Sequence, residues 1–183
     1  MTAKTKSVIQ CILVLALIAL VSGLLLGAVR LFTYVDPLQS AYDRFKEESG
    51  AEGEFSSMIV EKETAVEGTN GTIVYYAVST DGVHAFLAKG GGGYKGEKVP
   101  VYIFIKDEKI TKITPGDYEQ QTYMGELDKA NFYDNFVGKD VAELEPMSVD
   151  LVSGATGSST AVRNAIDAVV TYYNAKVGGK SNG

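Results

Sequence analysis

The stretch Val99-Pro-Val-Tyr-Ile-Phe-Ile105 decides the fold that this sequence predicts. Valine and isoleucine side chains alternate in it with Tyr102 and Phe104, so a strand over these residues is apolar on both faces. A strand of this kind lies inside a sheet whose two faces are both covered. The next strand, Lys109–Ile113, follows after the tight hairpin turn Lys106-Asp-Glu108.

Turn residues divide the sequence before this strand into three further strands. Glu67-Gly-Thr-Asn-Gly71 and Asp81-Gly82 are typical of turns, and residues that favour strands lie on either side of them. Short connections of this kind predict an antiparallel meander. The five predicted strands are Phe55–Glu63, Thr72–Val78, Val83–Ala88, Val99–Ile105 and Lys109–Ile113.

Helices are predicted before and after the strands. Asp36-Pro37 begins a short helix, because proline suits the first helical position. A second short helix is expected around Ala130–Phe136, and Ser159–Lys176 has the apolar spacing of an amphipathic helix, with Ser158 or Ser159 as its N-cap. Strands followed by helices predict an α+β fold, an antiparallel-sheet domain with flanking helices.

The N-terminal segment has the composition of a membrane helix. Ser7–Val29 contains 23 residues without a charge, and about 20 helical residues cross a ~30 Å hydrocarbon core. The apolar region of a cleaved signal peptide is shorter, about 7 to 15 residues, which favours an uncleaved anchor. Lys4 and Lys6 precede the span, so the positive-inside rule predicts a cytoplasmic N-terminus and an extracytoplasmic domain, with Arg30 as the dissenting charge.

We therefore expect a single-pass protein of the cell (inner) membrane with one folded domain. A domain of about 145 residues is close to the usual size for one core, so no second domain is needed. The predicted segments are a cytoplasmic N-terminus over 1–7, a transmembrane helix over 8–32, a linker helix over 33–54, the folded domain over 55–177 and a disordered tail over 178–183.

Charge and cysteine content exclude several functions. The formal charge is −6 for the whole chain. Residues 36–183 contain 14 basic and 23 acidic residues, a net charge of −9, which argues against nucleic acid as a partner. Cys11 is the only cysteine, so disulfides within the chain, cysteine-ligated iron–sulfur clusters and c-type haem are excluded.

The run Asp150-Leu-Val-Ser-Gly-Ala-Thr-Gly-Ser158 places the Thr156 hydroxyl in a turn of small residues that opens the C-terminal helix. The first N–H groups of a helix lack intrahelical partners, and the helix dipole leaves partial positive charge there, so an anion held by Thr156 would be stabilised. Gly154, Ala155 and Gly157 keep the approach to this hydroxyl open. The alternative is an ordinary loop with a helix cap, in which Thr156 carries no group.

This run resembles the flavinylation signature Asp-x-x-Ser/Thr-Gly-Ala-Thr/Ser-x-Ser/Thr of the FMN-binding domain family. That family includes the G subunit of the Rnf electron-transport complex and the C subunit of the sodium-translocating NADH:quinone reductase. The resemblance implies that a separate flavin transferase, using FAD and a divalent cation, attaches FMN covalently to Thr156 through a phosphodiester. The resemblance also implies that residues 55–177 form an FMN-binding domain. The neighbouring positions expected to contact the cofactor are Asp150, Ser153, Gly154, Ala155, Gly157 and Ser158.

Weaker matches extend the resemblance over residues 90–172. Each of them is short, but their order and spacing are similar to those of the family. They are Gly93-Tyr-Lys-Gly96 before the strand at Val99, Asp107-Glu-Lys-Ile-Thr111 after it, and the stretch Phe132–Lys139.

The loop Asp117–Gly125 departs from the family, whose members commonly carry Glu-Thr-Pro-Gly-Leu-Gly here. In relatives this loop is expected to lie near the flavin, so the family's contacts to the flavin ring and its reduction potential do not carry over to this chain. Tyr94 and Tyr123 lie in loops and are candidate stacking partners of the ring. The other tyrosines of this half are expected in the core or on the sheet.

The resemblance implies a membrane-anchored electron-transfer subunit of an Rnf-type ferredoxin:NAD oxidoreductase that pumps sodium ions or protons. Its partners would be the other membrane subunits of that complex, and the chain would not be catalytic alone. One alternative is a stand-alone extracellular flavin electron carrier. Another is a flavin-free binding or structural ectodomain.

Two other candidate sites have simpler interpretations. Gly91-x-Gly93-x-x-Gly96 matches the dinucleotide fingerprint, but a strand follows it and no βαβ unit surrounds it, so a flexible loop is expected. His84 is the only histidine, and a metal site would need several more ligands. Exposure of His84 to solvent is favoured over a place at the flavin edge.

Overall fold

The computed structural model describes residues 3–33 and 36–178. The chain divides into two compact units after Gln39. The first contains helix α1 (Ala3–Thr33) and the beginning of α2 (Pro37–Ser49), and the second contains the rest of α2, the sheet and the later helices. The part of the predicted tail that follows Gly178 lies outside the described residues.

Helix α1 is apolar along most of its length. Ile12–Arg30 has a mean hydropathy of 2.9, and none of it is buried against other parts of the structure. In the described part of the chain this is the one helix that is long and apolar enough to cross a membrane, a property that signal sequences share. The predicted apolar N-terminal helix is thus present.

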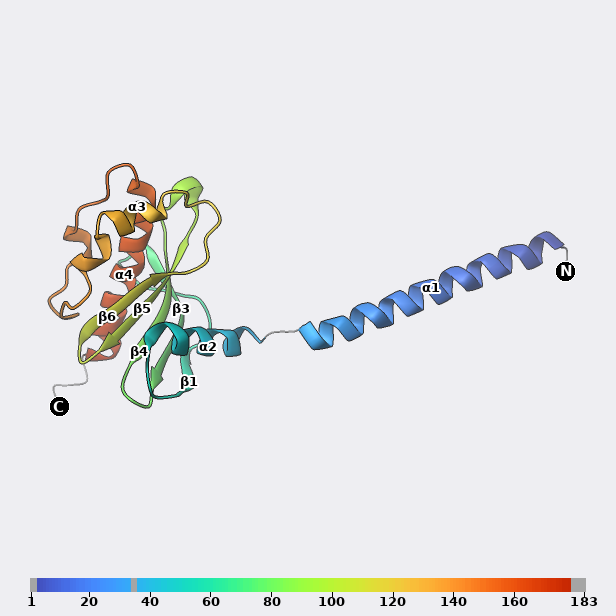
Figure 1. Cartoon of the computed structure of the whole chain (residues 1–183), viewed down its shortest axis with the longest axis horizontal. Coiled ribbons are helices and arrows are strands. Elements are labelled where there is room, and N and C mark those ends of the chain that lie inside the picture. Colours follow the sequence, from blue (N-terminus) through green and yellow to red (C-terminus); the bar gives the residue numbers. More distant parts are fainter. Residues whose placement is uncertain (1–2, 34–35, 179–183) are drawn as a thin grey trace. The chain divides into compact units, whose positions relative to one another are not determined.

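The second unit is built on one antiparallel sheet (Figure 1). The order of its strands is β1-β3-β4-β5-β6, with the short β2 also paired to β3. The run from β3 to β6 is the predicted meander, in which each strand pairs with the next one along the chain. The strands are β1 (Phe55–Val60), β2 (Thr64–Ala65), β3 (Gly71–Ser79), β4 (His84–Gly90), β5 (Val99–Lys106) and β6 (Lys109–Pro115).

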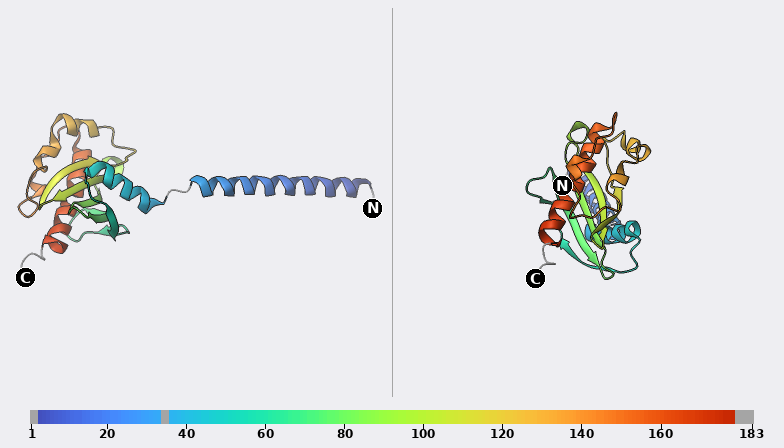
Figure 2. Two further views of the ribbon diagram at one scale, coloured as in Figure 1. Left: turned by 60° about the horizontal axis from the view of Figure 1, so that its bottom comes forward. Right: turned by 90° about the vertical axis from the view of Figure 1, so that its left-hand side faces the viewer.

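Strand β5 has a covered face on each side, as its sequence predicts. Its valine and isoleucine side chains are fully buried in the core that α4 (Thr156–Lys176) closes. On the opposite face, the ring of Phe45 from α2 lies 6.1 Å from Tyr102 and 6.3 Å from Phe104, edge to face. Figure 2 shows α4 and α2 on the two sides of the sheet.

Two local signals in the sequence are confirmed. Asp36 accepts a hydrogen bond from the Leu38 N–H at 2.9 Å, so α2 begins where the Asp-Pro pair predicts. At the hairpin between β5 and β6, Asp107 and Glu108 have φ values of 51° and 61°, the left-handed pair that a tight two-residue turn requires.

The segment after the sheet differs from the expectation in detail. Helix α3 (Met124–Lys129) forms where a loop was expected, and the helix predicted at Ala130–Phe136 is a short 3₁₀ turn, η2 (Phe132–Asn135). A second 3₁₀ turn, η3 (Pro146–Ser148), precedes α4. The fold is α+β, an antiparallel sheet with flanking helices that follows an apolar N-terminal helix.

Candidate functional site

Helix α4 begins at Thr156, three residues earlier than predicted. The prediction of Ser158 or Ser159 as N-cap is wrong: Ala155 is the N-cap and makes no side-chain capping bond. The Ser159 hydroxyl instead donates to the Ala155 carbonyl at 2.9 Å. The Ser159 N–H donates to the same carbonyl, as in a regular helix. Serine can bond back to the preceding turn in this way, so it is not confined to caps.

The Thr156 side chain is exposed at this helix start. Within the described residues, the N–H groups of Thr156, Gly157 and Ser158 meet no acceptor, as is usual for a first turn without a cap. The first turn also carries no acidic side chain, so the positive end of this 21-residue helix is not neutralised locally. The arrangement suits a phosphate group bonded to the Thr156 oxygen.

The two glycines beside Thr156 are needed for different reasons. Gly154 has a φ of +82° with open space around its Cβ position, so backbone conformation is what requires glycine there. At Gly157 a Cβ would lie 3.2 Å from the Tyr94 nitrogen, so a side chain would press on a neighbouring segment. Gly157 thus lets the Gly93–Tyr94 backbone lie against the first turn of α4.

Asp150 and Ser153, the first part of the signature, are exposed and line one shallow hollow of about 500 Å³. Glu126 and Lys129 of α3 line the same hollow and form an ion pair at 2.7 Å. Arg163 of α4 donates to the Val149 carbonyl at 2.9 Å and so ties the start of the signature to the helix. The signature residues that line the hollow and Thr156 therefore belong to one loop, which is bonded to α4 at Val149 and runs into α4 at Thr156.

The glycine run before Tyr94 lies in close contact with α4. Residues 91–93 form a loop between β4 and η1, as expected, and this loop packs on the helix. A Cβ at Gly90 would lie 1.8 Å from the Ala161 carbonyl oxygen, and one at Gly92 would lie 2.8 Å from the Thr160 methyl. Asn164, buried in α4, donates to the Gly91 carbonyl at 2.8 Å. Only residues without side chains allow this approach, and the approach brings Tyr94 to the helix start.

Tyr94 and Tyr123 are both exposed, at 58% and 59%. Tyr94 belongs to the 3₁₀ turn η1 (Tyr94–Gly96), and Tyr123 is the N-cap residue of α3. Lys95 lies 5.4 Å from the centre of the Tyr94 ring. The Tyr94 backbone lies against the first turn of α4, and contact of either ring with a flavin remains a prediction.

The sequence analysis missed Gln121, which joins these segments. Its side chain is 2% exposed and accepts hydrogen bonds from the Ser158 hydroxyl at 3.0 Å and the Tyr94 N–H at 3.2 Å. Ser158, a residue of the signature, is therefore buried against Gln121 and does not face the surface. No local pattern reveals such a contact, because its partners are 27 and 37 positions away in the sequence.

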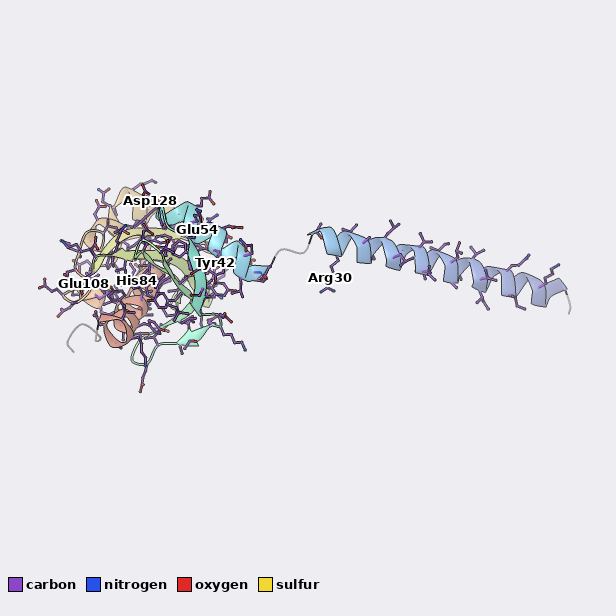
Figure 3. The ribbon with its side chains drawn as sticks, turned by 90° about the horizontal axis from the view of Figure 1, so that it is seen from below. Arg30, Tyr42, Glu54, His84, Glu108 and Asp128 are labelled. Carbon is purple, nitrogen blue, oxygen red and sulfur yellow. The ribbon has the colours of Figure 1, made fainter. Side chains whose placement is uncertain are left out.

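His84 lies at the other end of α4, and the expectation that it faces solvent is wrong. Its Nδ1 is 2.8 Å from the Tyr76 hydroxyl, and its ring meets the Tyr173 ring edge to face at 5.2 Å. Figure 3 labels His84 within the unit that contains the sheet. Burial lowers the pKa of His84 below 6.5. Among the described residues there is no group of three or more side chains that could hold a metal ion.

Comparison with known proteins gives one family. The model of the FMN-binding domain family matches residues 93–171, from the turn before Tyr94 to near the end of α4. The match includes Thr156, Tyr94, Tyr123 and Gln121. No curated protein matches the chain. Residues 93–171 of this chain are therefore similar to the FMN-binding domain family, and this part of the chain contains the exposed Thr156 at the start of α4.

Proposed function

We propose that FMN is attached to Thr156 by a phosphodiester and that the chain is the flavin-carrying subunit of an Rnf-type electron-transport complex. The observation that carries the proposal is the exposed Thr156 hydroxyl at the uncapped start of α4, inside the matched domain. A capping hydroxyl would accept a hydrogen bond from a first-turn N–H, whereas Ala155 occupies the N-cap position here and no side chain caps the helix.

The residues around Thr156 suit the phosphate of FMN. The first-turn N–H groups and the helix dipole favour its negative charge, and Gly154 leaves space beside it. When bound, FMN supplies one- and two-electron transfer. This chain would hold the phosphate, place Tyr94 and Tyr123 beside the ring and exclude part of the solvent.

Attachment is a group transfer that the chain does not perform alone. The Thr156 oxygen forms a bond to the phosphorus on the FMN side of FAD, the pyrophosphate P–O bond breaks, and AMP leaves. The hydroxyl proton passes to a base of the transferase. A threonine hydroxyl is a weak nucleophile, so a flavin transferase and a divalent cation are needed to activate it and to stabilise the charge on the phosphate.

We infer that α1 anchors the domain, with the N-terminus in the cytoplasm and the flavin outside. The apolar span Ile12–Arg30 and the two lysines before it support this orientation. Protease added to intact spheroplasts should digest the domain and leave the N-terminus. Other membrane subunits of the complex should co-purify with the anchored chain, whereas a stand-alone carrier would purify without them.

The test is co-expression with a flavin transferase, followed by denaturing gels and intact mass. The parent should fluoresce and gain the mass of FMN less one water. Thr156→Ala should lose the fluorescent band, because no nucleophile remains, and Thr156→Ser should keep part of it. Ser148→Ala is the matched control, because Ser148 is an exposed serine outside the signature, and it should keep its Thr156 flavin. A colourless parent, or flavin on Thr156→Ala, would contradict the proposal.

A further inference from the structure

The Gln121 side chain is buried between three segments that meet at the start of α4. Its Oε1 accepts from the Tyr94 N–H at 3.2 Å and from the Ser158 hydroxyl at 3.0 Å. Its Nε2 donates to the Glu97 carboxylate at 2.8 Å and to the Tyr94 carbonyl at 3.4 Å. All four hydrogen-bonding positions of the amide are used.

The direction of this amide is fixed by the chemistry of its partners. A backbone N–H such as that of Tyr94 can only donate, and a carboxylate such as that of Glu97 can only accept. Turning the Gln121 amide over would therefore place its NH₂ group against the Tyr94 N–H and its oxygen against the Glu97 carboxylate and the Tyr94 carbonyl, while the Ser158 hydroxyl can donate or accept. A buried polar group left unpaired in this way is costly.

Glu97 extends the same network into the loop that departs from the family pattern. Its carboxylate accepts from the Glu119 N–H at 2.7 Å and from the Gln120 N–H at 2.9 Å. Burial acts to raise the pKa of Glu97, but the hydrogen bonds from Glu119, Gln121 and Gln120 outweigh it and lower the pKa. The carboxylate therefore stays ionised at neutral pH and holds the loop that carries Tyr123.

We propose that Gln121 and Glu97 are positioning residues for flavin attachment, which hold the Tyr94 turn and the 117–125 loop against the first turn of α4. This inference rests on the proposed attachment at Thr156. Gln121 accepts from the Ser158 hydroxyl, two residues from the reacting Thr156, and from the Tyr94 N–H, while Glu97 accepts from two N–H groups of the 117–125 loop. A small displacement of a reacting group lowers rates strongly, by up to about 100-fold for ~1 Å.

Exchanging the two side chains tests the pair. Gln121→Glu places a carboxylate against that of Glu97. Glu97→Gln replaces one accepting oxygen by an NH₂ group, which meets either the Glu119 N–H or the Gln120 N–H together with the Gln121 NH₂, so each single change opposes like groups. The double exchange restores a donor facing an acceptor between the two side chains. It loses the acceptor of the Gln120 N–H and the donor to the Tyr94 carbonyl. Gln120→Glu is the control, since its side chain is exposed and only its backbone N–H joins the network.

The measurement is the initial rate of flavin attachment by the purified transferase with FAD, per folded protein, with folding followed by circular dichroism. We expect the rate of each single variant to fall at least about tenfold at neutral pH, the double exchange to recover part of that loss, and Gln120→Glu to match the parent. The rate of Gln121→Glu should also recover at lower pH, because one protonated carboxyl can donate to the other.

Other outcomes separate the two claims. A parent that takes no flavin overturns the proposed function and this inference with it. A flavin-bearing parent with single variants of equal rate overturns the inference alone, as does a double exchange no better than the single changes. If a single variant does not fold, recovery of folding and attachment in the double exchange supports the pair, and failure of that recovery contradicts it.

Discussion

The two ends of α4 are built on different principles. At the N-terminal end, glycines let the backbones of residues 90–94 lie directly on the helix, and the hydroxyl of Thr156 is exposed. At the C-terminal end, the rings of Tyr76, His84 and Tyr173 fill the space between helix and sheet. Tyr173 is roughly 25 Å along the helix from Thr156, at about 1.5 Å per residue.

Because of this difference, we expect flavin attachment to depend on the N-terminal end of α4 and the burial of large apolar side chains to stabilise the fold at its C-terminal end. The aromatic end buries large side chains, which stabilise the fold by removing apolar surface from water. The glycine end buries little side-chain area but fixes backbone positions around a reactive group. Substitutions at the aromatic end should therefore lower the free energy of unfolding. Substitutions of the exposed rings of Tyr94 and Tyr123 should change the reduction potential of the flavin.

The largest effect on stability is expected from removing the Tyr76 ring. This side chain is 3% exposed and stacks on Phe86 with ring centres 4.2 Å apart. Tyr76→Ala leaves a cavity and should lower the free energy of unfolding by about 3 to 5 kcal/mol, measured by urea titration. Tyr76→Phe keeps the ring and should cost about 1 kcal/mol, the hydroxyl's bond to His84.

A changed rate of flavin attachment in Tyr76→Ala would contradict this difference between the two ends of α4. The folded fraction of this variant should accept flavin at the parent's rate, because the substituted ring is far from Thr156. A strong loss of attachment in folded protein would mean that the two ends act as one unit.

A clear loss of stability is also expected at Gly90. A Cβ there would lie 1.8 Å from the Ala161 carbonyl oxygen, which belongs to helix backbone and cannot turn aside. Gly90→Ala should destabilise the domain by about 3 kcal/mol through overpacking. Gly125→Ala is the matched control: it has open space in α3 and should be neutral or stabilising by up to ~1 kcal/mol. Equal unfolding midpoints for the two variants would contradict the close contact.

The next effect is a pH dependence from the aromatic end. Burial lowers the pKa of His84 below 6.5, so the unfolded chain binds the proton more readily than the folded one. Stability from this group is complete above about pH 6.5 and falls as the pH drops toward the lowered pKa. His84→Gln should flatten the urea midpoint between pH 7 and pH 5, measured against the parent. If the urea midpoint changed with pH by the same amount in both proteins, His84 would not be the cause of the pH dependence.

The smallest effect on stability is expected at Tyr123. Its ring is 59% exposed and makes no capping bond, so Tyr123→Ala should change the unfolding free energy by less than about 0.5 kcal/mol. If the ring contacts the flavin, the same variant should shift the midpoint potential while covalent attachment persists. An unchanged redox titration would return Tyr123 to the ordinary surface.

Much of the sheet could be predicted, because its signals are local. Turn residues mark the hairpins, and the two apolar faces of β5 predict a covered strand. Helix α3 was missed because six residues are too few to show a periodicity. The start of α4 was misplaced because the hydroxyl of Ser159 bonds back along the helix, which the sequence does not distinguish from a cap.

The candidate site was predictable only in part. The signature identifies Thr156, since a hydroxyl among small residues before a helix is a local pattern. The contacts of Gly90 with Ala161 and of Gln121 with Ser158 join segments far apart in the chain. They depend on how the sheet and helix pack, and no periodicity in the sequence encodes them.

Peptide mass spectrometry on protein co-expressed with the transferase tests the central claim most directly. Cleavage after Lys139 and Arg163 gives one peptide that contains Thr156 and five other hydroxyl residues, Ser148, Ser153, Ser158, Ser159 and Thr160. Fragmentation should place FMN, less one water, on Thr156 alone. An unmodified peptide, or flavin on any of the other five, would contradict the account.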